Sequence, residues 1–422
     1  MIQALTIFLL TYALMLALPK FRHIVAITAA ALYVLLGILP AGHILPAIDF
    51  NVILMLAGTM AIVALFIESN MPQRIADSLL ARTPNVCWAI VTLALFAGVV
   101  SAFVDNVATL LIAAPVGLAI SKRLGVPPIP VLISISVSSN LQGAATLVGD
   151  TTSILLGGYA NMDFLDFFFM DGRFGIFWAV ELGAIATIPV LYMIFRKYKD
   201  KPPESAPAEV KDFFPSYLLI LLVAMLILAS FIPRKPDITN GLICVGLGVI
   251  GTVRAMARGG VASLKKVVTE VDYVTLLLLG GLFIVIAGIT EAGVIDAIGI
   301  GFIRLSGGDL FLVYTLLVFG SVLFSAFIDN IPYVATMLPV VTVIAETLEV
   351  APTLLHFGLL IGATLGGNLT PIGAAANITA IGILRREGHE VRVRDFLKIG
   401  APFTLVAVLV GYIFIWLVWG RT

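Results

Sequence analysis

One short motif occurs twice in this chain, and it constrains the fold more than any other feature. Residues 101–107 read SAFVDNV and residues 325–331 read SAFIDNI, so the copies start 224 positions apart (325 minus 101). Each copy interrupts a long apolar run with a carboxylate and a carboxamide, Asp105-Asn106 in the first and Asp329-Asn330 in the second. A charged side chain at the centre of a bilayer costs about 3 kcal/mol or more. Polar interruptions at matching positions of two apolar half-chains therefore indicate the substrate site of a transporter.

The similarity between the two half-chains extends beyond this motif. Further matched residues keep the same order along both halves, and they are Asp49 with Asp272, Gly143 with Gly367, Thr146 with Thr370, and Gly149 with Gly373. A shared glycine-rich composition would make segments look alike, but it would not produce one shared order. We therefore predict repeat 1 at 1–195, a cytoplasmic linker at 196–212, and repeat 2 at 213–422.

The composition is that of an integral membrane protein. Apolar residues make up 60% of the chain and charged residues 12%, with a mean hydropathy of +1.10. Soluble domains carry about twice that charged fraction. The formal net charge is zero, which argues against a nucleic-acid partner. The two cysteines and four histidines show no metal-ligand spacing, and no nucleotide-binding loop is present, so we expect no cofactor.

The apolar segments predict an all-α polytopic fold made of two inverted repeats. In each half we expect five membrane spans and one re-entrant hairpin, at 86–121 and at 310–346. One span of each half is a broken helix, at 129–158 and at 353–384. An odd number of spans inverts the second half relative to the first. If the loop holding Lys20 is cytoplasmic, all but five of the 25 Lys and Arg residues lie on that side. This charge bias predicts that both termini lie outside. We expect the membrane to be a bacterial or archaeal plasma membrane. A model in which each hairpin spans twice keeps the same sidedness.

The two hairpin tips are the first candidate for chemistry. Asp105 and Asp329 each precede an apolar segment, where a carboxylate commonly caps a helix by accepting backbone N–H groups. A buried carboxylate can also carry H⁺ or bind Na⁺, and helix ends can bind ions. Capping alone accounts for one such residue, whereas two matched ones favour a functional role as well.

The two broken helices are the second candidate. Residues 138–153 and 362–377 are rich in Gly, Ser, Thr and Asn, and Pro371 removes a backbone donor. Close packing of helices through small residues is the alternative explanation. The density of hydroxyls and amides favours a binding site instead. Asp150 adds a carboxylate in the first half only, because Ala374 stands at the matching position.

These observations define a set of candidate site residues. The candidate substrate ligands are Asn106, Asn140, Gly143, Thr146, Asn330, Gly367, Asn368, Thr370 and Asn377. The candidate coupling residues are Asp105, Asp150 and Asp329, with Na⁺ as a candidate ligand at Asp105 and Asp329. No basic side chain lies within these interruptions. An anion would therefore be held by helix N-termini, amides and co-bound cations, and a cation or a neutral hydroxide remains an alternative substrate.

The motifs at 103–109, 143–150 and 366–377 resemble the ion-transporter superfamily, in the branch of arsenite permeases, NhaD-type sodium/proton antiporters and the melanosomal P protein. The resemblance covers nearly the whole chain. It implies two re-entrant hairpins, two broken helices, elevator-like alternating access and a homodimer. Dicarboxylate-transporting relatives carry a Ser-Asn-Thr tip, where this chain has Asp-Asn-Val and Asp-Asn-Ile. That departure argues against citrate or succinate as the substrate.

We therefore expect a secondary active transporter of a small ion, coupled to H⁺ or Na⁺. The leading substrate is an oxyanion or a hydroxide such as arsenite, exported from the cell. The alternatives are Na⁺/H⁺ antiport, citrate or dicarboxylate transport, and a passive channel. An enzyme is not expected, because the chain has no HExxH or GxSxG motif.

Overall fold

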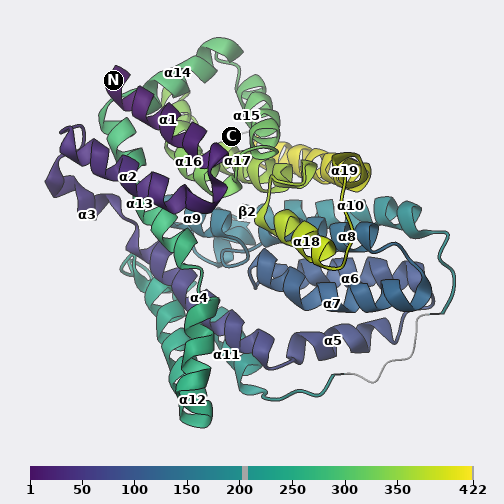
Figure 1. The fold of residues 1–422 in the computed structure, drawn as a ribbon. Coiled ribbons are helices and arrows are strands. Elements are labelled where there is room, and N and C mark those ends of the chain that lie inside the picture. Colours follow the sequence, from purple (N-terminus) through teal and green to yellow (C-terminus); the bar gives the residue numbers. More distant parts are fainter. Residues whose placement is uncertain (202–207, 421–422) are drawn as a thin grey trace.

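The computed structural model describes residues 1–201 and 208–420, which are almost entirely helical (Figure 1). Residues 202–207 of the predicted 196–212 linker, and the last two residues, lie outside the described ranges. Within those ranges the strands are β1 (Phe169–Met170) and β2 (Arg173–Phe174), which form one short antiparallel hairpin. The all-α fold class is confirmed.

The helices of the first half are α1 (Ile2–Ala17), α2 (Arg22–Leu35), α3 (Ile44–Ala47), α4 (Phe50–Glu68), α5 (Met71–Leu80), α6 (Val86–Ser101), α7 (Asn106–Leu124), α8 (Pro128–Gly143), α9 (Thr151–Tyr159) and α10 (Ile176–Phe195). Those of the second half are α11 (Phe214–Ser230), α12 (Thr239–Glu270), α13 (Tyr273–Glu291), α14 (Val294–Ser306), α15 (Leu310–Ser325), α16 (Asn330–Thr347), α17 (Thr353–Leu360), α18 (Ala375–Arg386) and α19 (Val393–Trp419). Short 3₁₀ turns lie at Pro19–Phe21, Ala41–His43, Leu165–Phe167 and Gly367–Leu369, and a π-helical turn lies at Ile361–Leu365.

Carboxylates at equivalent positions start equivalent helices in the two halves. Asp49 accepts the Val52 N–H at 3.0 Å at the start of α4, and Asp272 accepts the Thr275 N–H at 3.0 Å at the start of α13. Asp105 and Asp329 are the N-caps of α7 and α16. Each cap satisfies backbone donors that the first helical turn leaves unpaired. The repeated sequence thus produces repeated local structure.

Several helices are long and apolar enough to cross a membrane. In the described part of the chain six helices meet that requirement alone, namely α4, α7, α10, α12, α13 and α19. The count rises to eight if two bent pairs each form one span, α1 with α2 at 116° and α14 with α15 at 117°. The predicted five spans per half, and the inversion of the halves across the membrane, stay predictions. The amphipathic helices α5 and α14 were not predicted, because they lie outside the long apolar runs.

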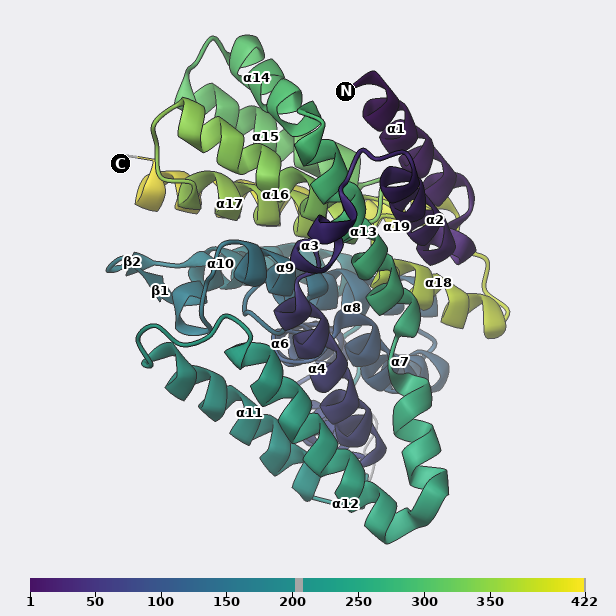
Figure 2. The same cartoon turned by 90° about the vertical axis from the view of Figure 1, so that its left-hand side faces the viewer.

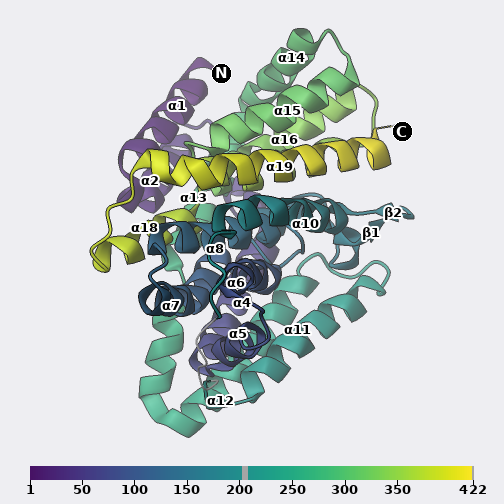
Figure 3. The ribbon, with the colours of Figure 1, turned by 90° about the vertical axis from the view of Figure 1, so that its right-hand side faces the viewer.

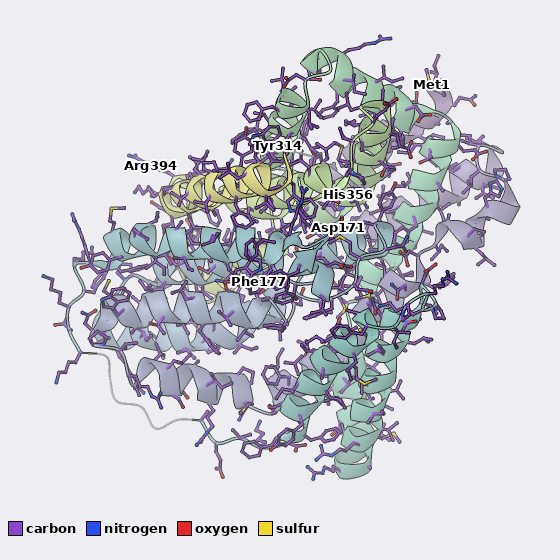
Figure 4. The ribbon with its side chains drawn as sticks, turned by 180° about the vertical axis from the view of Figure 1, so that it is seen from behind. Met1, Asp171, Phe177, Tyr314, His356 and Arg394 are labelled. Atoms are coloured by element: carbon purple, nitrogen blue, oxygen red, sulfur yellow. The ribbon has the colours of Figure 1, made fainter. Side chains whose placement is uncertain are left out.

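Helices from opposite halves pack against each other throughout the molecule. Figure 2 shows α4 of the first half beside α12 of the second, and α13 of the second half packs on α2 of the first. Figure 3 shows α10 and α19 running side by side. Within the second half, Tyr314 of α15 lies next to α19 when seen from behind in Figure 4, and its hydroxyl donates to the Tyr412 carbonyl oxygen at 2.9 Å. The core is therefore shared between the halves.

Candidate functional site

A cavity of about 180 Å³ lies where the two halves meet. Its lining includes all three predicted coupling carboxylates, Asp105, Asp150 and Asp329, and both tip amides, Asn106 and Asn330. They come from the N-terminal ends of α7, α9 and α16. Because helix N-termini carry unpaired N–H groups and partial positive charge, these ends can hold carboxylates or bound anions. Residues separated by more than 200 positions in the sequence thus form one polar chamber.

At both tips, backbone N–H groups bond one oxygen of the carboxylate, but the surroundings of the second oxygen differ. Asp105 Oδ2 accepts the N–H groups of Val107 and Ala108 at 3.0 and 3.1 Å. Asp329 Oδ1 accepts the Ile331 N–H at 3.0 Å, and its Oδ2 accepts a charged hydrogen bond from Arg22. Within the described residues, Asp105 accepts no hydrogen bond from a side chain and forms no ion pair, so its carboxylate is held by backbone N–H groups alone.

Each broken helix is tied to the adjacent tip by one repeated contact. The Thr146 hydroxyl donates to the Ala102 carbonyl oxygen, and 224 positions later the Thr370 hydroxyl donates to the Ala326 carbonyl oxygen. The chain passes so closely here that a Cβ on Gly149 would lie 2.5 Å from the Gly143 carbonyl oxygen. A Cβ on Gly373 would lie 2.6 Å from the Gly367 carbonyl oxygen. Glycine is therefore required at both breaks.

Buried amides connect the two halves behind the cavity. Asn106 Nδ2 donates to Asn140 Oδ1 at 3.0 Å, and Asn140 Nδ2 donates to Asn368 Oδ1 at 3.1 Å. Asn368 Nδ2 in turn donates to the Val137 carbonyl oxygen at 2.8 Å. Asn377 donates to the carbonyl oxygens of Gly367 and Thr370 at 3.0 and 3.2 Å. Because these amides bond to the protein, they hold the broken helices together.

The predicted substrate ligands consequently fall into two groups. Asn106 and Asn330 line the cavity. The others lie outside its lining in this conformation, and they are Asn140, Gly143, Thr146, Gly367, Asn368, Thr370 and Asn377. Their contacts support the cavity from behind, and direct contact of these residues with a substrate stays a prediction.

Asp150 is the most buried of the three carboxylates, with 5% of its surface exposed. Its Oδ1 accepts the Thr151 N–H at 2.8 Å, and its Oδ2 accepts the Thr152 hydroxyl at 2.7 Å. The Thr152 hydroxyl also lies 2.8 Å from the Thr364 hydroxyl in the second half. Asp150 therefore connects through one threonine to the opposite broken helix.

Sequence reasoning missed three charged residues that line the cavity: Arg22, Glu270 and Asp272. The match between Asp272 and Asp49 was visible, but nothing local relates Arg22 to Asp329, 307 positions away. Among the described lining residues, five carboxylates face a single guanidinium. In the same described part of the chain, no group of three or more His, Cys, Asp or Glu side chains has the geometry to hold a metal.

Comparison with known proteins shows which family and which fold this chain resembles. The family model described as "Citrate transporter" matches residues 12–362 and 245–422. An uncharacterised transporter of Mycobacterium tuberculosis is 32% identical over 99% of this chain and 98% of its own length. The human P protein is 26% identical over 87% of this chain, which matches about half, 53%, of that protein.

Two solved structures share the fold at low sequence identity. The YdaH transporter of Alcanivorax borkumensis, reported to have an unusual topology, aligns with a TM-score of 0.62 at 16% identity, over 89% of this chain and 86% of that one. MtrF of Neisseria gonorrhoeae, described within a class of antimetabolite efflux pumps, aligns with a TM-score of 0.56 at 14% identity, over 89% and 83%. Both alignments concern the fold alone.

Proposed function

The chain belongs to the citrate transporter family, and from this premise we propose that it is a secondary active transporter of a small ion, coupled to H⁺ or Na⁺. One observation carries the proposal. Asp105, Asp150 and Asp329 come from distant parts of an apolar chain and line one cavity between its halves. Carboxylates are expensive inside a membrane protein, and their usual use there is to bind or relay ions.

The coupling step that we propose is ion exchange on the carboxylates. Asp105 has no side-chain donor or basic partner in the described ranges, so it can take a proton or Na⁺ while Oδ2 keeps its backbone bonds. Asp150 offers a second exchange site connected to the opposite half. An elevator-type movement of the tips and broken helices relative to the remaining helices would then carry the cavity across the membrane.

The leading substrate class remains a small oxyanion, or a hydroxide such as arsenite. A multiply charged anion such as citrate would meet five carboxylates and one arginine among the described lining residues, and it would need co-bound cations. The family model is nevertheless described as a citrate transporter. Citrate therefore belongs in any direct test.

Na⁺/H⁺ exchange is the second candidate, and the excess of carboxylates favours it. In that reaction the carboxylates bind the transported cation itself, and no anion is needed. We further expect a homodimer in the plasma membrane with both termini outside.

Purified protein in liposomes can decide between these reactions. Flux of arsenite, citrate and Na⁺ is measured with an imposed proton or sodium gradient, and again after ionophores have removed that gradient. We expect accumulation that stops when the gradient is removed. Flux that is unchanged by gradient removal indicates a passive channel and contradicts coupling, and Na⁺ movement without an added anion selects the exchanger.

A further inference from the structure

Among the contacts that differ between the two tips, one involves a full positive charge. Arg22 bonds to Asp329, and the two side chains are 22% and 25% exposed. An arginine side chain stays protonated at any physiological pH. The oxygen of Asp329 that would otherwise be open to an ion is therefore already paired, whereas Asp105 has no basic or side-chain partner among the described residues.

We propose that Arg22 acts as a built-in cation at the Asp329 tip and thereby sets how many H⁺ or Na⁺ ions the transporter binds. The inference rests on the proposed function, in which cavity carboxylates exchange the coupling ion. With Arg22 in place, Asp105 and Asp150 remain for exchange. Without it, Asp329 becomes an additional ion site.

The surrounding structure holds Arg22 at this position. Arg22 is the first residue of α2, directly after the sharp bend that separates α2 from α1. On α1, the Tyr12 hydroxyl donates to the Pro332 carbonyl oxygen at 2.6 Å and also contacts the Thr336 hydroxyl. Both arms of the bent pair therefore contact the first turns of α16, and Arg22 is anchored beside Asp329.

The matching loop in the second half does not do the same for Asp105. Residues 232–234 read IPR where residues 18–20 read LPK, and Lys235 follows. Lys235 pairs with Asp163 and lies 3.3 Å from the Ala229 carbonyl oxygen. Arg234, Lys235 and Asp163 line a separate cavity of about 570 Å³ that Asp105 does not border. Both basic residues of this loop therefore border a different cavity from the one that Asp105 lines.

The other charges around the site explain why a cation would replace Arg22. The described charged residues that share the cavity are Asp105, Asp150, Glu270, Asp272, Asp329 and Arg22. Removal of the guanidinium leaves only carboxylates in that set. Their mutual repulsion is relieved when one of them binds H⁺ or Na⁺.

The number of bound ions can be measured without knowing the substrate. Each ion that binds only the folded protein stabilises it in proportion to the logarithm of its concentration, so the slope counts bound ions. We propose to follow thermal unfolding of the purified protein against NaCl, balanced with choline chloride. A parallel series varies pH without Na⁺. We expect Arg22→Gln to steepen one of the two slopes by the increment of a single ion, and Arg22→Lys to leave both slopes unchanged.

Two further variants show whether the added ion binds at Asp329. Arg22→Gln combined with Asp329→Asn should return to the wild-type slope. Lys235→Gln, which removes a basic side chain from the loop of the other half, should keep the wild-type slope. An unchanged slope in Arg22→Gln, or an increase that persists in the double variant, overturns the proposal.

If the Arg22→Gln protein fails to fold, two single variants with Arg22 in place test the proposal instead. Asp329→Asn alone should keep the wild-type slope, while Asp105→Asn should lose one ion. A lost ion in Asp329→Asn overturns the inference. If neither Na⁺ nor H⁺ stabilises the wild-type protein, it is the proposed coupling that fails.

Discussion

The turn between α6 and α7 and the turn between α15 and α16 are built alike and surrounded differently. Both begin a helix with an aspartate cap, and both accept the hydroxyl of a threonine from the adjacent broken helix. One tip meets Arg22, and the other lies near Asp150, whose counterpart in the second half is Ala374. Backbone geometry has thus been kept in duplicate while charge has diverged. Because charge decides which ions bind, the two tips have the same shape and different chemistry.

A second pair of caps shows which differences are tolerated. Asn85 caps α6 by accepting the Trp88 N–H at 3.1 Å, and Asp309 caps α15 by accepting the Leu312 N–H at 2.8 Å. These positions are 224 apart, as are the tips. The fold therefore accepts asparagine or aspartate as an N-cap, so the aspartates retained at both tips call for a reason beyond capping.

The largest effect is expected from Asp105→Asn. Asparagine keeps the cap but cannot exchange H⁺ or Na⁺, so coupled flux in liposomes should fall to that of empty vesicles while the unfolding temperature stays near wild type. Asp309→Asn is the control, because its cap lies outside the cavity lining. Gradient-driven flux that survives in Asp105→Asn would remove this residue from the coupling mechanism.

Gly149→Ala and Gly373→Ala test whether the two breaks are equally tight. Each new Cβ would lie within 2.6 Å of a carbonyl oxygen. Overpacking of this kind costs about 1–3 kcal/mol, so both variants should unfold at lower temperature by similar amounts. Gly246→Ala, with nothing within 4 Å of the added Cβ, is the control and should be close to neutral. A large difference between the two breaks would show that their local structures are not equivalent.

The parts of this site that sequence reasoning could predict are those set by local sequence. An aspartate before an apolar helix predicts a cap, and glycines in a polar interruption predict a break, so the tips and both broken helices were expected. The bond between Asn140 and Asn368 and the approach of Arg22 were not, because they depend on how distant helices pack. The same limit applies to the seven ligand candidates outside the cavity lining. The five with polar side chains indicated polar contacts, and only the packing shows which protein groups they meet in this structure.

A smaller effect is expected at the contact between the opposite broken helices. Thr364→Val removes the hydroxyl that meets Thr152, and Thr152→Val removes that contact together with the bond to Asp150. Polar contacts between membrane helices are worth about 0.6 kcal/mol on average, so a double-mutant cycle on thermal stability should return a coupling of about that size. Thr252→Val, which removes only a bond within α12, provides a control outside the contact. A coupling of zero would mean that the halves do not communicate through these hydroxyls.

The smallest expected effect concerns the residues just before the first helix of each half. No side-chain cap precedes α1 in the described structure, whereas Asp212, just before α11, accepts Arg254 at 2.6 and 3.2 Å and the Phe214 N–H at 3.0 Å. The hydrogen bond from Arg254 lowers the pKa of Asp212 below its usual value. Because the folded-state pKa is the lower one, the stabilisation is present above the unfolded pKa of about 3.9 and is lost as pH falls through the folded value. Asp212 is partly exposed, so screening limits the effect to roughly 0.5 kcal/mol.

Asp212→Asn should therefore unfold at a slightly lower temperature than wild type near neutral pH. The gap between the two unfolding temperatures should close below about pH 4. A gap of constant size across that range would assign the stabilisation to packing of the Arg254 side chain on Phe214, 3.9 Å from the ring centre, instead of to charge.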